Sequence, residues 1–121
     1  MNKKTLIVGA SENPQRYAFK AAKMLSDFGH DIVLFGKSGG QFNAIEIQKK
    51  LPDVIPDLHT ITLYINPTHQ EALMDKLIAL APKRILFNPG TENPIFAKKA
   101  QNAGIQTEDA CTLVLLSTDQ F

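Results

Sequence analysis

A short apolar run followed at once by small residues limits the possible folds of this 121-residue chain more than any other feature. Leu6-Ile7-Val8 shows no alternation with polar residues, which is typical of a strand covered on both faces. Gly9-Ala10-Ser11 then favours a tight turn in which the backbone comes close to a ligand. After Asn13-Pro14, a helical pattern begins at Gln15 or Arg16. This order of strand, small-residue turn and helix predicts a phosphate-binding site in an α/β nucleotide-binding domain.

The same alternation continues to the end of the chain. Further strands are predicted at 31–35, 60–65, 84–87 and 105–107, with a weaker edge strand at 45–47. Helices are predicted as far as Gly29, after a capping box at Thr68-His69-Gln70-Glu71, from Asn93-Pro94 to Gly104, and over 110–116. Strands and helices joined by short loops form right-handed βαβ units. We therefore expect an α/β fold with an open, doubly wound, mainly parallel sheet of five or six strands.

Size and charge narrow the class of protein. Residues 1–121 have the length of a single domain, and the formal net charge of +1 creates no field that favours nucleic acid. No stretch approaches the roughly 20 apolar residues of a membrane span. The single cysteine, Cys111, cannot form an internal disulfide, which favours a reducing compartment. These features predict a cytoplasmic domain that binds neither nucleic acid nor membrane.

Four turns are expected at the carboxyl edge of the sheet, where doubly wound sheets bind their ligands. They contain Gly9-Ala10-Ser11, Gly36-Lys37-Ser38-Gly39-Gly40, Asn66-Pro67-Thr68 and Asn88-Pro89-Gly90-Thr91. Turns after strands are commonly built from such residues whatever their role. Composition alone therefore leaves a ligand site and ordinary turns equally open.

Two details of the sequence narrow the choice of ligand. A dinucleotide fingerprint has three glycines, but here Ser11 and Pro14 follow Gly9 where the second and third should stand. NAD sites place an acidic residue after the second strand to bind the ribose 2′-hydroxyl, whereas this chain has Lys37 in that region. Because a lysine pairs with phosphate, a phosphorylated ribose is favoured over plain NAD. The alternative for Lys37 is an ordinary solvated surface lysine.

Taken together, these motifs resemble the CoA-binding domain family. Its small bacterial members have a Rossmann-like fold, with helices on both faces of the sheet, that matches the N-terminal domain of the succinyl-CoA synthetase alpha subunit. The resemblance covers essentially all 121 residues. It is carried by Val8-Gly9-Ala10-Ser11 with Pro14, Arg16 and Tyr17, by Phe35-Gly36-Lys37-Ser38-Gly39-Gly40, by Ile65-Asn66-Pro67, by Asn88-Pro89-Gly90-Thr91-Glu92-Asn93, and by Asp109-Ala110-Cys111. The chain departs from the family at the fourth turn, where Leu86-Phe87-Asn88-Pro89-Gly90 replaces Trp-x-Gln-Gly.

The resemblance implies a stand-alone protein that binds CoA or acyl-CoA and has no catalytic residues. Backbone N–H groups of Gly9, Ala10 and Ser11 are expected at the pyrophosphate, and Lys37 with Arg16 at the ribose phosphate. Tyr17 either stacks on a ring of the ligand or packs into the core. The residues expected to bind the ligand are Gly9, Ala10, Ser11, Arg16, Tyr17, Gly36, Lys37, Ile65, Asn66, Pro67, Asn88, Pro89 and Gly90.

Two other functions remain open. The first is an NADP-type dinucleotide-binding oxidoreductase subunit, and the second is a degenerate regulatory or interaction module that has lost its ligand. The three histidines are too scattered to predict a metal site, and Cys111 in its apolar segment is more typical of a buried, inert thiol than of a reactive one. The apolar segment 113–116 belongs to the core or, where exposed, to a contact in a homodimer or with another protein.

Overall fold

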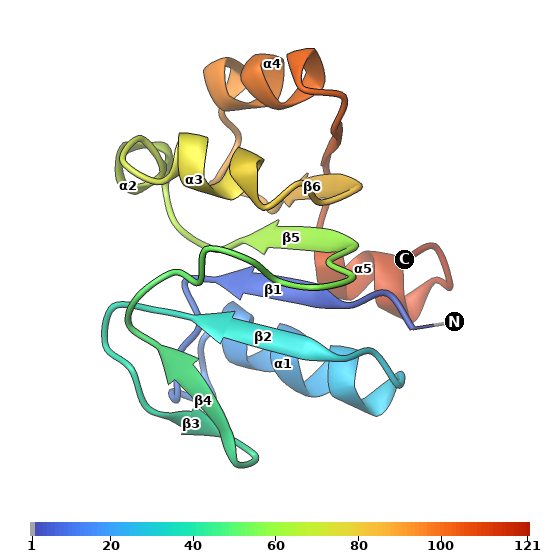
Figure 1. Ribbon diagram of the computed structural model, residues 1–121. Coiled ribbons are helices and arrows are strands. Elements are labelled where there is room, and N and C mark those ends of the chain that lie inside the picture. Colours follow the sequence, from blue (N-terminus) through green and yellow to red (C-terminus); the bar gives the residue numbers. More distant parts are fainter. Residues whose placement is uncertain (1) are drawn as a thin grey trace.

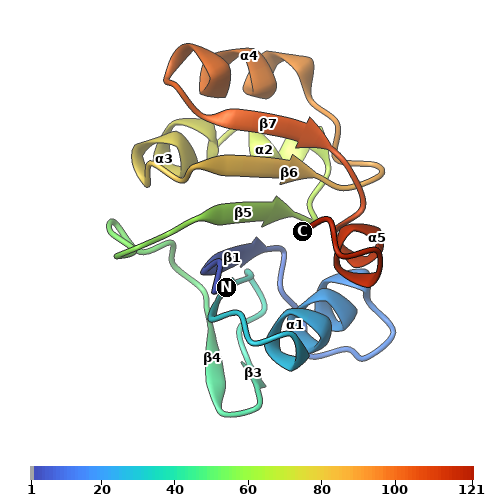
Figure 2. The same ribbon diagram turned by 90° about the vertical axis from the view of Figure 1, so that its right-hand side faces the viewer.

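The computed structural model describes residues 2–121, which form one seven-stranded sheet flanked by helices (Figures 1 and 2). The strands are β1 (Thr5–Val8), β2 (Ile32–Phe35), β3 (Gln41–Phe42), β4 (Ile45–Gln48), β5 (Thr60–Leu63), β6 (Arg84–Phe87) and β7 (Gln106–Asp109). The helices are α1 (Tyr17–Asp27), α2 (Pro67–Gln70), α3 (Met74–Ala79), α4 (Pro94–Asn102) and α5 (Thr112–Ser117). Among residues 2–121, no helix has the length and apolar character needed to cross a bilayer.

The sheet is covered on both faces, as the sequence predicts. On one face, α3, α4 and the segment 51–58 pack through residues such as Leu77 and Phe96 against β1, β5 and β6. On the other face, α1 and α5 lie side by side in both views and pack through residues such as Leu25 and Leu116 (Figures 1 and 2). The central strands β1, β5 and β6 are buried along their whole length. The continuous apolar runs in the sequence arise from this double burial.

The order of the strands is β3-β4-β2-β1-β5-β6-β7, and every neighbouring pair is parallel except β3 with β4. The chain first builds the sheet outward from β1 through β2 to β4, and then restarts on the other side of β1 with β5. The order therefore reverses between β1 and β5. In a doubly wound sheet, the crevice at this reversal, outside the carboxyl ends of the strands, is where ligands bind.

The sheet has seven strands, more than the five or six expected. The strand predicted at 45–47 is β4, but it is not at the edge, because the additional strand β3, two residues long, pairs with it in an antiparallel hairpin. Two residues are too few to create a recognisable alternation in the sequence. The hairpin turns through Asn43 and Ala44, whose φ angles are 46° and 66°. Positive φ at both central residues is the conformation of a type I′ turn.

Ala44→Gly is expected to raise the free energy of unfolding by about 0.5–1 kcal/mol, because glycine adopts positive φ without the strain that a Cβ creates. Urea unfolding of the variant measures this difference. Ala97→Gly in the interior of α4 is the control, and it is expected to cost a similar amount because glycine is a poor helix former. A loss of stability in both variants would contradict the turn conformation.

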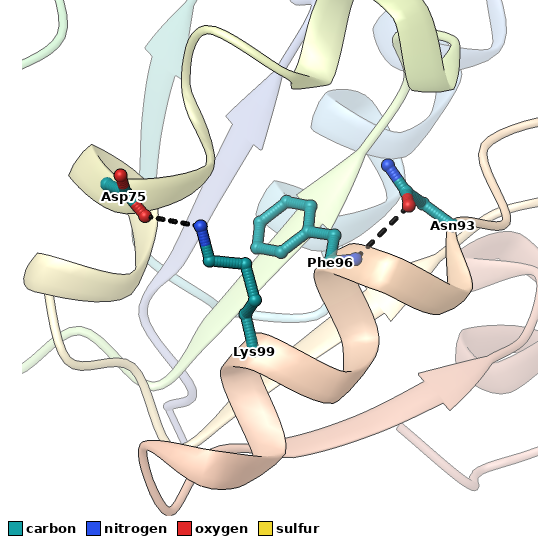
Figure 3. Close-up of polar contacts among 4 residues, drawn as sticks. All are labelled: Asp75, Asn93, Phe96 and Lys99. Atoms are coloured by element: carbon teal, nitrogen blue, oxygen red, sulfur yellow. Dashed lines mark hydrogen bonds and ion pairs between the residues drawn. The ribbon is translucent and has the colours of Figure 1, made fainter.

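Several helix ends differ from the expectation: α1 begins at Tyr17 and α5 at Thr112, and two short helices, α2 and α3, replace the single helix expected after the third turn. The capping box at 68–71 is wrong, because α2 begins at Pro67 and Asn66 is its N-cap, with Oδ1 accepting from the His69 N–H at 3.0 Å. The prediction for α4 is confirmed: Asn93 Oδ1 accepts from the Phe96 N–H at 3.1 Å, and Pro94 is the first helical residue (Figure 3).

Candidate functional site

A cleft of about 740 Å³ lies at the carboxyl ends of β2, β1, β5 and β6. Four neighbouring strands span about 14 Å at the usual spacing, so the cleft suits an elongated ligand. The structure brings together most of the residues predicted to bind a ligand, namely Gly9, Ala10, Ser11, Arg16, Tyr17, Gly36, Lys37, Ile65, Asn66, Pro89 and Gly90. Pro67 and Asn88 do not line the cleft. Its volume falls in the ordinary range for small-molecule and cofactor sites.

The turn after β1 offers fewer backbone donors than the sequence suggested. The N–H groups of Gly9 and Ala10 both donate to the Phe35 carbonyl oxygen, at 2.9 and 3.0 Å. The expectation that these two N–H groups bind the pyrophosphate is therefore wrong. They instead tie the turn to the end of β2, where the neighbouring strand supplies an acceptor that no local pattern reveals.

Other backbone donors remain free beside this turn. No residue among 2–121 accepts a hydrogen bond from the backbone N–H groups of Ser11, Tyr17 or Ala18, all of which line the cleft. Tyr17 and Ala18 open α1, an 11-residue helix whose dipole is positive at this end. Free N–H groups together with this dipole form a site that favours phosphate.

The turn after β2 packs against the turn after β1 with no room for a side chain. A Cβ at Gly36 would overlap the Ala10 carbonyl oxygen, and a Cβ at Gly40 would overlap the Glu12 carboxylate. Glu12 also accepts from the Gln41 N–H at 2.9 Å. This bond holds the carboxylate against the second turn, and Glu12 does not line the cleft.

The charged side chains that line the cleft, Arg16 and Lys37, are cationic and exposed, and they lie on the side near β1 and β2. The imidazole-bearing residue His69 lines the side near β5. Among residues 2–121, no Asp or Glu side chain lines the cleft. This combination of basic side chains and free N–H groups favours an anionic ligand.

Two tyrosines shape the cleft. Tyr17 is 67% exposed, so of its two predicted positions, packing in the core is wrong. Tyr17 lines the cleft, and Lys20 Nζ lies 5.2 Å from the centroid of its ring. Tyr64 also lines the cleft, but its hydroxyl is buried and has no partner in residues 2–121. Burial raises the pKa of the Tyr64 phenol to about 12, so it stays neutral at physiological pH.

The side chain of Asn88 makes all its hydrogen bonds within the protein. Its Nδ2 donates to Thr62 Oγ1 at 2.7 Å and to the Leu63 carbonyl oxygen at 2.8 Å, and its Oδ1 accepts from the Thr112 N–H at 2.9 Å. The side chain therefore joins the ends of β5 and β6 to the start of α5. It has no atom to spare for a ligand unless these bonds break.

The first turn of α2 and the residues after it form a wall of the cleft, of which the sequence analysis placed only Thr68 at the ligand-binding edge. Thr68, His69, Ala72 and Leu73 all line this wall. Placing the N-cap at Asn66 would also have revealed His69, because it then falls in the first turn of a helix that starts at the ligand-binding edge. Phe35, Ser38 and Thr91 also line the cleft.

His30, His59 and Cys111 do not line the cleft. Burial lowers the pKa of His30 and His59, and the positive charges of Lys3 and Arg84 lower both further. Cys111 is half-buried at the N-cap of α5. Among residues 2–121, no group of three or more His, Cys, Asp and Glu side chains is arranged to hold a metal ion.

The family of the chain follows from its sequence. A family model described as a CoA binding domain matches residues 3–117. The chain therefore belongs to the CoA-binding domain family, as its motifs indicated. A comparison with curated proteins gives no match.

Solved structures share the fold over nearly the whole chain. A crystal structure described as an uncharacterized protein is 40% identical, with a TM-score of 0.97, and the match covers 100% of this chain and 99% of that one. A hypothetical protein from Pyrococcus horikoshii OT3 is 25% identical, with a TM-score of 0.86 and coverage of 97% and 83%. The cell-free ID.343 structure from Thermus thermophilus is 20% identical, with a TM-score of 0.88 and coverage of 99% and 91%. The Rossmann-like fold is thus confirmed.

Proposed function

We propose that this protein binds CoA or an acyl-CoA in the cleft and holds it without transforming it. The observation that carries the proposal is the group of free N–H donors at Ser11, Tyr17 and Ala18, beside the basic side chains of Arg16 and Lys37. Membership of the CoA-binding domain family supports the choice of ligand. A reducing compartment such as the cytoplasm fits the single cysteine.

The cleft has a different character at each end, which matches the two ends of CoA. Near β1 and β2 it presents cations and free N–H groups, which suit the pyrophosphate and the phosphorylated ribose. Near β5 and β6 its lining includes Ile65, Leu73 and Pro89, which suit the less polar pantetheine arm. The order of these features along the cleft follows the order of the groups along the ligand.

A second candidate ligand is NADP, because Lys37 would also pair with its 2′-phosphate. The absent second and third glycines of the fingerprint weigh against it. The dinucleotide fingerprint also assigns no function to the wall of the cleft near β5, which consists of Thr68, His69, Ala72 and Leu73. CoA accounts for both halves of the cleft and is therefore preferred.

Calorimetric titration with CoA, dephospho-CoA and NADP tests the proposal. We expect CoA to bind most tightly and dephospho-CoA more weakly, since dephospho-CoA lacks the 3′-phosphate. An absence of CoA binding at millimolar concentration would contradict the proposal. Tighter binding of NADP than of CoA would favour the second candidate.

A further inference from the structure

Gln70, at the end of α2, is a fully buried amide with every polar atom engaged. The side chain has no exposed surface. Its Nε2 donates to the Ile65 carbonyl oxygen at 2.9 Å and to the Thr91 carbonyl oxygen at 2.8 Å, and its Oε1 accepts from Asn93 Nδ2 at 3.0 Å. A glutamine amide has two N–H groups and one carbonyl, and all are used here.

The two carbonyl groups that Gln70 binds belong to different loops of the cleft. Ile65 follows β5 and Thr91 follows β6, and both residues line the cleft. Because a single nitrogen donates to both carbonyls, each is held within 2.9 Å of the same atom. The geometry of one amide group therefore fixes the separation of the two loops.

Asn93 extends this connection into α4. Its Oδ1 caps the helix by accepting from the Phe96 N–H (Figure 3). Its Nδ2 donates to Gln70, so its two functional atoms bind two different elements. The Thr91 hydroxyl in turn donates to the Asn88 carbonyl oxygen at 2.8 Å. The loop after β6 is thus held at Thr91 and Asn93 by buried hydrogen bonds.

An apolar residue could fill the Gln70 position without the free-energy cost of burying polar groups. It would need no partners, whereas a buried amide is costly unless every group is paired. An apolar side chain would, however, leave the Ile65 and Thr91 carbonyls without the donors that join them. The glutamine is therefore better explained by the spacing of the loops than by packing.

We propose that Gln70 is a positioning residue that sets the width of the cleft between the loops after β5 and β6, and so the fit of the ligand's arm. This inference rests on the proposed function. The nucleotide side of the cleft, at Ser11 and Lys37, makes no hydrogen bond with Gln70. Gln70 therefore acts on the part of the ligand that distinguishes CoA from its nucleotide alone.

Gln70→Met tests the inference by the ratio of two affinities. Methionine has nearly the same shape but no N–H donors. By calorimetry, we expect its affinity for CoA to fall about tenfold, while its affinity for 3′-phospho-ADP, which lacks the arm, stays unchanged. Equal losses for both ligands would show that Gln70 only supports the fold, and would overturn the inference.

Two further variants separate positioning from stability. Thr60→Val is the control, because it removes a buried hydrogen bond of 2.8 Å from Arg84 Nε. Thr60 begins β5, at the edge of the sheet opposite the cleft, so both affinities should stay unchanged. Asn93→Ser keeps an N-cap for α4 but loses the donor to Gln70, and we expect a smaller change of the ratio in the same direction. A changed ratio in Thr60→Val would contradict the inference.

Amide hydrogen exchange tests the inference without any ligand. In Gln70→Met we expect faster exchange in segments 64–66 and 90–91 and unchanged exchange in segments 9–11 and 36–38. Equal acceleration in all four segments would overturn the inference. Failure of the wild-type protein to bind CoA would refute the proposed function. The exchange pattern would still decide whether Gln70 holds the loops after β5 and β6 in position.

Discussion

Gly36→Ala is expected to lower the affinity for CoA about 100-fold, the scale on which a misplacement of about 1 Å weakens a positioned contact. The Cβ of the new alanine would overlap the Ala10 carbonyl oxygen, which is part of the backbone and cannot move alone. The Ala10–Ser11 peptide is planar and trans, so its carbonyl and the Ser11 N–H point in opposite directions. Displacing the carbonyl therefore displaces the free N–H that we assign to the pyrophosphate.

Gly29→Ala is the matched control for this variant. Gly29 has a φ angle of 84° and no atom near its Cβ position, so alanine there creates backbone strain without a clash. That strain costs about 1–2 kcal/mol, close to the roughly 1–3 kcal/mol expected for overpacking at Gly36. Urea unfolding should show similar losses of stability, while calorimetry should show lost affinity only for Gly36→Ala. Unchanged CoA affinity in Gly36→Ala would contradict the position assigned to the pyrophosphate.

Lys37→Met is expected to reduce the preference for CoA over dephospho-CoA. Lys37 is exposed at the cleft, so its contact with the 3′-phosphate is screened by water, and we expect a loss of about five- to tenfold in CoA affinity. The affinity for dephospho-CoA should stay unchanged, because that ligand has no 3′-phosphate. Calorimetry of both ligands measures the two values.

Lys98→Met is the control for Lys37→Met. Lys98 is exposed on α4 and does not line the cleft, so removing it changes the net charge equally without touching the site. It should leave both affinities unchanged. If Lys98→Met reduced CoA binding as much as Lys37→Met, the effect would come from the overall charge, and the specific contact would be refuted.

The sequence predicts the fold well where an element is determined by residues that are adjacent in the chain. Leu6-Ile7-Val8 is fully buried, and the glycines that follow α1 and α4, Gly29 and Gly104, both have a φ angle of 84°. These features depend on local patterns and double burial, which a single chain displays. The strand β3 escapes prediction because its two residues pair only through the hairpin.

The candidate site is predictable as a location but not as a set of contacts. The four turns meet at one edge because all carboxyl ends of a parallel sheet do so. Which groups remain free depends on neighbours distant in sequence. The Phe35 carbonyl oxygen accepts hydrogen bonds from the N–H groups of Gly9 and Ala10. The side chain of Asn88 is hydrogen-bonded to Thr62 and to the N–H of Thr112. Gln70 was missed because its three partners lie on three different segments.

Backbone amide chemical shifts recorded during a titration with CoA test the proposed site most directly. We expect the largest changes at Ser11, Tyr17, Ala18, Lys37 and Ser38, with further changes in segments 65–66 and 90–91. These amides belong to residues that line the cleft, and the first five have no hydrogen-bond acceptor among residues 2–121. The absence of any change at millimolar CoA, or changes centred on His30 and His59, would contradict CoA binding in the cleft.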